Sequence, residues 1–300
     1  MKNILLSGST GFVGQNLISY YKNNKAASVI ELSLRKPIPE TLPDAAAIIH
    51  LAGKAHDLKN ASNPQEYFEI NYGLTKELFA RFLDSDINNF IYFSSVKAVA
   101  DTIDGKLTET AEPKPATAYG QSKLQAEQYL LSKELPDGKR LFILRPCMIH
   151  GPGNKGNLNL LYKVVKSGIP YPLGAFHNRR SFLSIDNLLF ILNRILTNNS
   201  IPGGIYNLAD DESLSTTEVI QIIGRASGIK ARIWTLSSSL ITSLAKIGDK
   251  VHLPLNSERL KKLTESYEVC NEKIKNALGI TKLPVNAQDG LTKTIKSFHF

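Results

Sequence analysis

A tyrosine and a lysine four residues apart are the strongest candidates in this chain for proton transfer. The stretch "YGQSK" places Tyr119 and Lys123 on one face of a predicted helix. A tyrosine with its ordinary pKa of about 10 is a poor acid or base at neutral pH, but an ammonium group beside the phenol favours the phenolate. Ser95 ends the apolar run "NFIYFSS" and could donate a second hydrogen bond to a substrate oxygen. The three side chains predict acid–base chemistry, although tyrosine and lysine at this spacing are also common on ordinary helix surfaces.

A glycine-rich turn near the N-terminus has the pattern of a dinucleotide-binding loop. In "SGSTGFVG", Gly8, Gly11 and Gly14 follow an apolar run at 2–7 and lead into a predicted helix at 14–23. The first glycine allows the tight turn, the second lets the backbone approach a pyrophosphate, and the third permits close helix packing. The alternative is a plain glycine-bearing turn of a flavodoxin-like protein. In this strand-to-helix context the spacing favours dinucleotide binding.

The end of the second predicted strand bears on the choice between NAD and NADP. The run "SVIELS" ends at Ser33, and Arg35 follows it. A carboxylate at the strand end would accept the ribose hydroxyl of NAD, whereas an arginine suits the extra phosphate of NADP. No carboxylate stands at Ser33, and Ser33 with Arg35 could bind a phosphate. The pattern favours NADP over NAD, and the alternative is a solvated arginine on a loop.

These candidate residues must be positioned by alternating strands and helices. Further apolar runs at 46–53, 89–95 and 140–146 are separated by helical patterns at 67–84 and 119–135. The alternation predicts an α/β fold, a doubly wound Rossmann parallel sheet, with functional residues at the carboxyl ends of the strands.

The sequence pattern changes near residue 150. Residues 1–150 are predicted to form a Rossmann dinucleotide-binding domain. Residues 151–300 are predicted to form mainly a smaller α/β substrate-binding lobe, partly interwoven with the first domain. Apolar residues at 240, 244, 247 and 251 predict an amphipathic helix that packs on this lobe rather than on a membrane or a partner.

The composition of the chain limits the classes of partner that we expect it to bind. The 300 residues are 42% hydrophobic and carry a net charge of +9, which favours an anionic partner. No basic run is interleaved with aromatic residues, so a phosphate-bearing small molecule is expected rather than nucleic acid. Cys147 and Cys270 stand alone, and the histidines show no paired spacing, so neither a disulfide framework nor a metal site is expected. No apolar run approaches membrane-spanning length, and a cytoplasmic protein is expected.

Six motifs together resemble one family. "GSTGFVG", "HLAG", Asn71 in "INYGLT", "SSVKAVA", "YGQSK" and "LRPCMIHGPG" occur in the order and spacing of the extended short-chain dehydrogenase/reductases, over roughly residues 3–228. This is the NAD-dependent epimerase/dehydratase family of nucleotide-sugar enzymes. By this resemblance Ser95, Tyr119 and Lys123 form the catalytic triad.

The resemblance also implies binding residues. The cofactor is expected to contact Gly8, Thr10, Gly11, Phe12, Val13, Gly14, Ser33, Arg35, Leu51, Ala52, Gly53, Asn71, Ser94, Tyr119, Lys123, Pro146 and Ile149. The substrate is expected to contact Ser95, Lys97, Asn157, Arg180 and Arg259, with Arg179 as the alternative to Arg180.

The residues after Ser95 restrict which reactions of this family are expected. Related dehydratases carry an Asp-Glu pair there, whereas this chain has Val96 and Lys97, so 4,6-dehydration is not expected. The chain looks most like bacterial enzymes that act on UDP-N-acetyl-amino sugars for surface polysaccharides. Hydride transfer at C4 of a UDP-(4-keto-6-deoxy)-HexNAc is therefore expected, with NADP or NAD as the cofactor. The alternatives are a UDP-sugar 4-epimerase of the UDP-glucose 4-epimerase type and an NADP-sensing regulator without catalysis, which would usually lack the Tyr-Lys pair.

Four further expectations accompany the resemblance. Family members often form homodimers through the helices after Asn71 and at Tyr119, so a homodimer is one implied arrangement. The segment 34–47 is short where many relatives insert elements that hold the adenine. His150 stands where the family usually has a tyrosine, and either fills that place or touches substrate. Lys97 either contacts substrate, pairs with a nearby acid, or is solvated.

Overall fold

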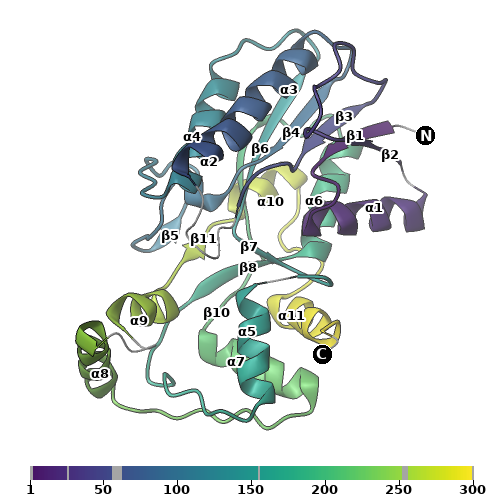
Figure 1. The fold of residues 1–300 in the computed structure, drawn as a ribbon. Coiled ribbons are helices and arrows are strands. Elements are labelled where there is room, and N and C mark those ends of the chain that lie inside the picture. The colour runs from purple at the N-terminus through teal and green to yellow at the C-terminus, as the bar shows by residue number, and fades with distance from the viewer. Residues whose placement is uncertain (1–2, 26, 56–62, 155, 252–255, 299–300) are drawn as a thin grey trace.

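The computed structural model describes residues 3–25, 27–55, 63–154, 156–251 and 256–298, and its centre is a parallel six-stranded sheet (Figure 1). Its strands, in spatial order, are β2 (Ser28–Leu32), β1 (Asn3–Ser7), β3 (Ala47–His50), β4 (Asn89–Phe93), β6 (Arg140–Pro146) and β9 (Gly204–Leu208). All of the pairings are parallel. The predicted doubly wound α/β fold is confirmed.

Helices cover both faces of this sheet, and the alternation of strand side chains explains why. Ile4 and Leu6 pack on one face, toward α1 (Phe12–Asn24), α6 (Ile185–Thr197) and α10 (Glu272–Leu278). Leu5, between them in sequence, packs on the other face, toward α3 (Leu74–Leu83) and α4 (Ala118–Leu131). Because both faces are buried, the central strands are continuous apolar runs rather than alternating ones.

The helical pattern predicted at 67–84 is divided into three parts. The short helix α2 (Pro64–Phe68) is followed by one π-helical turn, η1 (Glu69–Gly73), and then by α3. A π turn inside a helix is uncommon and is found mostly at functional sites. Here it carries Asn71, whose side chain is buried.

The second lobe is built around a three-stranded sheet of β7 (Met148–His150), β8 (Arg180–Ser184) and β10 (Ser213–Leu214). Its helices are α5 (Asn157–Lys166), α7 (Thr216–Ser227), α8 (Ser238–Val251), α9 (Ser257–Thr264) and α11 (Ala287–Lys296). The short strands β5 (Lys106–Leu107) and β11 (Glu268–Val269) pair with one another. The chain crosses between the lobes more than once, because β9, α6 and α10 belong to the first sheet and its cover.

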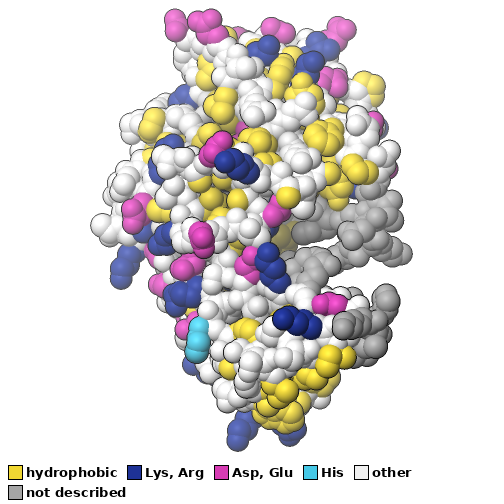
Figure 2. Space-filling view, turned by 90° about the vertical axis from the view of Figure 1, so that its left-hand side faces the viewer, with side chains coloured by type: hydrophobic (Ala, Val, Ile, Leu, Met, Phe, Trp, Pro, Cys, Tyr) yellow, Lys and Arg dark blue, Asp and Glu magenta, His cyan; other side chains and the backbone are white. Residues whose placement is uncertain are grey.

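Helix α8 turns part of its apolar surface outward. Leu240, Leu244 and Ile247 are 52%, 45% and 54% exposed, whereas Ile241 and Ala245 face the lobe and are buried. Apolar side chains gather at the lower end of the face that carries α8 (Figure 2). The predicted helix is present, but the prediction that 240, 244 and 247 pack on the lobe is wrong, and the side chain at 251 lies outside the described part of the structure. The apolar arc of this helix is wider than the part that the lobe covers, and periodicity alone does not tell which part is covered.

No helix within the described ranges combines the length and apolar character needed to cross a membrane.

Candidate active site

Tyr119 and Ser95 meet at the carboxyl edge of the main sheet. Tyr119 lies in the first turn of α4, which Thr117 caps by accepting from the Gly120 amide at 3.2 Å. Ser95 follows β4 and accepts from the Lys97 amide at 3.2 Å. Burial raises the pKa of Tyr119, and a hydrogen bond with Ser95 opposes this by lowering it. The expected preference for phenolate is therefore not the net effect here, because burial of the phenol outweighs the groups that stabilise its anion.

Lys123 lies one turn further along α4 and is buried. Its Nζ donates to the Phe93 carbonyl at 2.8 Å and lies 4.8 Å from the centre of the Tyr92 ring. Burial lowers the pKa of Lys123 to about 8, while the negative charge of Glu127 acts in the opposite direction. The amine can therefore change its charge within the working range of an enzyme.

Asn71 joins the "HLAG" stretch to the catalytic helix. Its amide accepts from the Lys54 main-chain nitrogen at 2.7 Å and donates to the Ser122 hydroxyl at 3.0 Å. A Cβ on Gly53 would lie 2.8 Å from Asn71 Oδ1 and 3.1 Å from Lys123 Nζ, so these three residues are in close contact. The structure thus brings together three residues that the sequence assigned to the cofactor site.

The glycine turn fits an anion. Gly8 has a φ of +74°, and a Cβ on it would lie 2.6 Å from the Ala52 nitrogen, so the turn packs directly on the Leu51–Ala52 backbone. No side chain caps α1 at Gly11. The amides of the first turn, at Phe12 and Val13, thus point out of a helix N-terminus without the acceptor that a cap would provide. Such a terminus suits the pyrophosphate of a dinucleotide.

The other residues that were expected to contact the cofactor lie on different elements and differ in burial. Ser33 and Arg35 follow β2 and are exposed, as is Thr10 in the glycine turn. Ser94 is buried, and its hydroxyl donates to the carboxylate of Glu127. Pro146 ends β6 and Ile149 lies in β7.

Segment 34–47 contains no helix and reaches strand structure only at Ala47, where β3 begins. Ile38 and Leu42 anchor it in the core beside α3, so it is held in place by packing.

Lys97 lies against the second lobe. Its Nζ donates to the Asp101 carbonyl at 2.7 Å and lies 4.4 Å from the centre of the Tyr267 ring. The Tyr267 hydroxyl donates to the Ala100 carbonyl at 2.7 Å, which ties the loop after Ser95 to the second lobe. Burial lowers the pKa of Lys97, and Asp101 and Glu265 raise it at longer range.

The two neighbouring arginines have different surroundings. Arg179 donates to the Ser213 carbonyl at 2.7 Å and lies 3.6 Å from the Glu268 carboxylate. Arg180 begins β8, donates from Nε to the Glu265 carbonyl at 3.0 Å and is close enough to Lys97 to affect its pKa. Arg180 is therefore the one near the loop that follows Ser95. Asn157 begins α5 and Arg259 lies in α9, but their side chains lie outside the described part of the structure.

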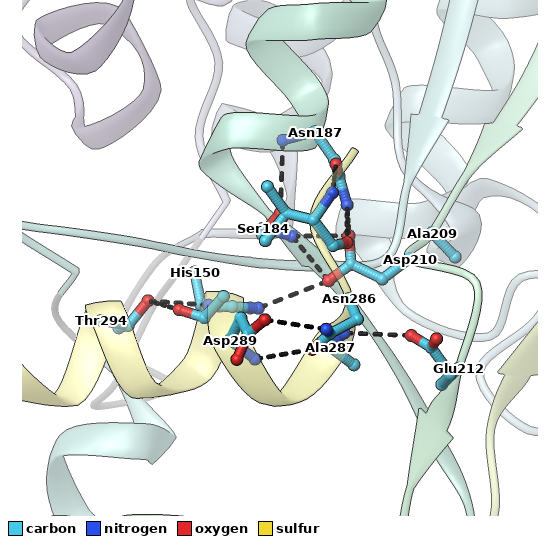
Figure 3. A network of polar contacts seen from close by, with 12 residues as sticks. His150, Ser184, Asn187, Ala209, Asp210, Glu212, Asn286, Ala287, Asp289 and Thr294 are labelled. Carbon is cyan, nitrogen blue, oxygen red and sulfur yellow. Dashed lines mark hydrogen bonds and ion pairs between the residues drawn. The ribbon is translucent and has the colours of Figure 1, made fainter. Parts of the chain in front are cut away.

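His150 is an interior residue. Its Nδ1 lies 2.8 Å from Thr294 Oγ1 on α11, and its Nε2 lies 3.7 Å from the carboxylate of Asp210. Asp210 in turn accepts hydrogen bonds from the Ser184 amide and the Asn187 side chain (Figure 3). Of the two sequence interpretations, this network supports His150 as a core residue that holds α11 against β7 and β8.

Sequence reasoning missed a buried ion pair behind Lys123. Glu127 and Arg145 are 1% and 2% exposed and contact one another through both carboxylate oxygens. The spacing of the sequence could have indicated that Glu127 lies near Lys123, because Glu127 stands four residues after Lys123 on the same helix face. Among the described residues, no group of three or more acidic, histidine or cysteine side chains is arranged to hold a metal.

The chain is similar to several known proteins. A model of the NAD dependent epimerase/dehydratase family matches residues 4–209. The UDP-glucose 4-epimerase of Vibrio cholerae is 28% identical, over 99% of this chain and 95% of that protein. The GDP-6-deoxy-D-mannose reductase of Pseudomonas aeruginosa is 25% identical, over 77% and 82%. The structure of RMD from Pseudomonas aeruginosa complexed with NADPH shares the fold, with a TM-score of 0.72, 20% identity and coverage of 99% and 98%.

Proposed function

Because the chain belongs to the NAD dependent epimerase/dehydratase family, we propose that it is an NAD(P)-dependent oxidoreductase that transfers hydride at C4 of a nucleotide sugar. One observation carries the proposal: Ser95, Tyr119 and Lys123 converge beside Asn71 and Gly53, at the same sheet edge as the uncapped glycine turn. Ligands of open α/β sheets bind at this edge.

The residues of the chain have separate tasks in this chemistry. Gly8, Gly11 and the first turn of α1 would hold the pyrophosphate, and a bound nicotinamide would supply or accept the hydride. Tyr119 gives a proton to the C4 oxygen in reduction and takes it back in oxidation. Ser95 donates a hydrogen bond to the same oxygen, and the Lys123 ammonium stabilises the phenolate that remains.

The proposed reaction is reduction of a UDP-4-keto-6-deoxy-HexNAc in surface polysaccharide synthesis. Val96 and Lys97 replace the carboxylates that a dehydratase would need, which supports a simple hydride transfer. The exposed Ser33 and Arg35 support NADP, and a dissociable NADPH suits a reductase that exchanges its cofactor in each turnover. Arg180, Asn157 and Arg259 are proposed to contact the substrate from the second lobe, and Lys97 from the loop that follows Ser95.

A UDP-sugar 4-epimerase is the second candidate. The observation in its favour is the 28% identity to the Vibrio cholerae UDP-glucose 4-epimerase over almost the whole of both chains. A cofactor-sensing regulator has less support, because Tyr119 and Lys123 are both present on α4. The unpaired Cys147 and Cys270 suit a reducing compartment such as the cytoplasm, and a homodimer through α3 and α4 remains part of the proposal.

Cofactor analysis and product analysis separate the two candidates. The purified protein is denatured, and the released nucleotide is identified. A reductase releases little nucleotide, binds added NADPH and oxidises it with a UDP-4-keto-6-deoxy-HexNAc. An epimerase releases NAD and interconverts UDP-N-acetylglucosamine and its 4-epimer without net cofactor oxidation. Absence of both activities, with no cofactor binding, would contradict the proposed function.

A further inference from the structure

Three consecutive residues at the end of β4 are joined to three successive turns of α4. The Phe93 carbonyl accepts from Lys123, the Ser94 hydroxyl donates to Glu127, and Ser95 lies close enough to Tyr119 to lower its pKa. Residues four apart share a helix face, so Tyr119, Lys123 and Glu127 form one column along the buried side of the helix. The carboxylate of Glu127 is thus placed by the same strand end that places the catalytic pair.

Glu127 is held rigidly. Arg145 Nε lies 3.0 Å from one carboxylate oxygen and 3.2 Å from the other, and its Nη2 contacts the second oxygen at 2.5 Å. Both side chains are buried, at 3% and 1% exposure. A bidentate arginine and a serine hydroxyl together fix the position of the carboxylate.

The other described groups around Lys123 are uncharged at neutral pH. His50 has a pKa lowered to about 3 by burial and by Lys123, so it is neutral. Burial raises the pKa of Tyr92 and that of Tyr119, so both phenols are protonated. Asn71 and the Gly53 backbone carry no charge. Arg145 is positive and contacts the Glu127 carboxylate, and Glu127 is the anion that acts on Lys123 among the described groups.

A structural role alone accounts poorly for this arrangement. A buried ion pair contributes little more to stability than apolar residues of the same size, because both charges lose their hydration. A buried amine without a nearby anion, by contrast, loses its proton readily. The pair therefore has a clear use beside Lys123, whose ammonium must persist while the phenol of Tyr119 ionises.

We propose that Glu127, fixed by Arg145 and Ser94, is a positioning residue that keeps the buried Lys123 amine protonated during the reaction. The inference rests on the proposed function for its catalytic meaning. The expected effect of Glu127 on the charge of Lys123 does not depend on which sugar is the substrate. Burial and Glu127 act on the Lys123 pKa in opposite directions, in agreement with the geometry.

The test compares Glu127→Gln with Glu127→Asp. Lysine Cε carbons are labelled with ¹³C, Lys123 is assigned by its loss in Lys123→Arg, and its titration is followed by NMR. In Glu127→Gln the midpoint is expected to fall by about one unit or more, the effect of losing an opposite charge nearby. In Glu127→Asp, which retains the charge but packs less well, the midpoint is expected to remain close to that of the wild type. Glu134→Gln removes an exposed carboxylate just beyond α4 and should leave it unchanged.

Two further measurements keep the test decisive. If Glu127→Gln does not fold because Arg145 is left unpaired, Glu127→Gln with Arg145→Gln removes both charges, and the midpoint is still expected below that of the wild type. With an active substrate, the alkaline fall in kcat should move to lower pH in Glu127→Gln. Equal midpoints in the Gln, Asp and wild-type proteins would overturn the inference, as would equal shifts in Gln and Asp. Absence of turnover with every nucleotide sugar contradicts the proposed function, while the NMR titration still tests the electrostatic inference.

Discussion

Gly120 lies against the main-chain carbonyl of Lys97, so that a Cβ at this position would overlap the carbonyl oxygen and lie 2.8 Å from the Pro115 side chain. The first turn of α4 therefore packs directly on the loop that carries Ser95. This contact brings the hydroxyl of Ser95 to the phenol of Tyr119, although the two residues come from different elements.

Gly120→Ala is expected to separate the two catalytic elements. The added methyl meets backbone, which cannot rotate away, so we expect a loss of about 1–3 kcal/mol in the free energy of unfolding. We also expect a fall in kcat larger than that of any surface variant. Denaturant unfolding and steady-state kinetics measure both. Gly73→Ala is the matched control, because its Cβ would lie 3.9 Å from the nearest atom. Equal behaviour of the two variants would contradict the packing argument.

Tyr119→Phe removes the proposed proton donor and leaves the ring. We expect kcat to fall by about 10²–10⁴-fold, the usual contribution of a positioned acid or base. NADPH binding, followed by the fluorescence of the bound cofactor, should be retained, since the ring still fills its place in α4. Unchanged NADPH oxidation with substrate would show that Tyr119 is not the acid.

Activity is expected to fall as the pH rises through about 8, where Lys123 loses its proton. The sign follows from the role of the amine: the ammonium stabilises the phenolate, and the neutral amine does not. A profile of kcat between pH 6 and about 10 measures the effect. Lys123→Arg keeps the positive charge at all these pH values, so the alkaline fall should disappear even if its kcat is lower. A fall at the same pH in this variant would assign the titration to another group.

Cofactor preference is expected to depend on the end of β2. Arg35→Ala should weaken NADPH binding by about tenfold and leave NADH binding unchanged, since it removes one charge-assisted contact to the 2′-phosphate. Ser33→Asp should favour NAD, because a carboxylate accepts from the ribose hydroxyl and repels a phosphate. Isothermal titration with both cofactors measures the ratio. Lys36→Ala is the control for loss of a positive charge next to Arg35, and equal losses in the two variants would indicate a non-specific charge effect.

The local patterns of the sequence were sufficient for the architecture. The glycine spacing, the Tyr119–Lys123 column and the alternation of apolar runs with helical patterns each depend on residues a few positions apart, and short-range geometry alone relates such residues in space. The fold was therefore predictable, while the family was expected from the resemblance of six ordered motifs. The π turn was not predictable, since the same residues are compatible with a regular helix, and the contacts of Asn71 on this turn with Lys54 and Ser122 form only in the folded chain.

Tertiary structure decided what surrounds the candidate site, because charges and volumes from distant segments meet only in the folded chain. Tyr119 and Lys123 were visible as a pair in "YGQSK", but burial shifts the pKa of both, and the pKa of Lys123 also depends on Glu127, whose partner Arg145 comes from β6. His150 could have faced a substrate or the core, and its contact with Thr294, which is 144 residues away in the sequence, placed it in the core. The sequence determined which groups are available for chemistry at this sheet edge. The packing of distant segments decided their charge states and which of them face the interior.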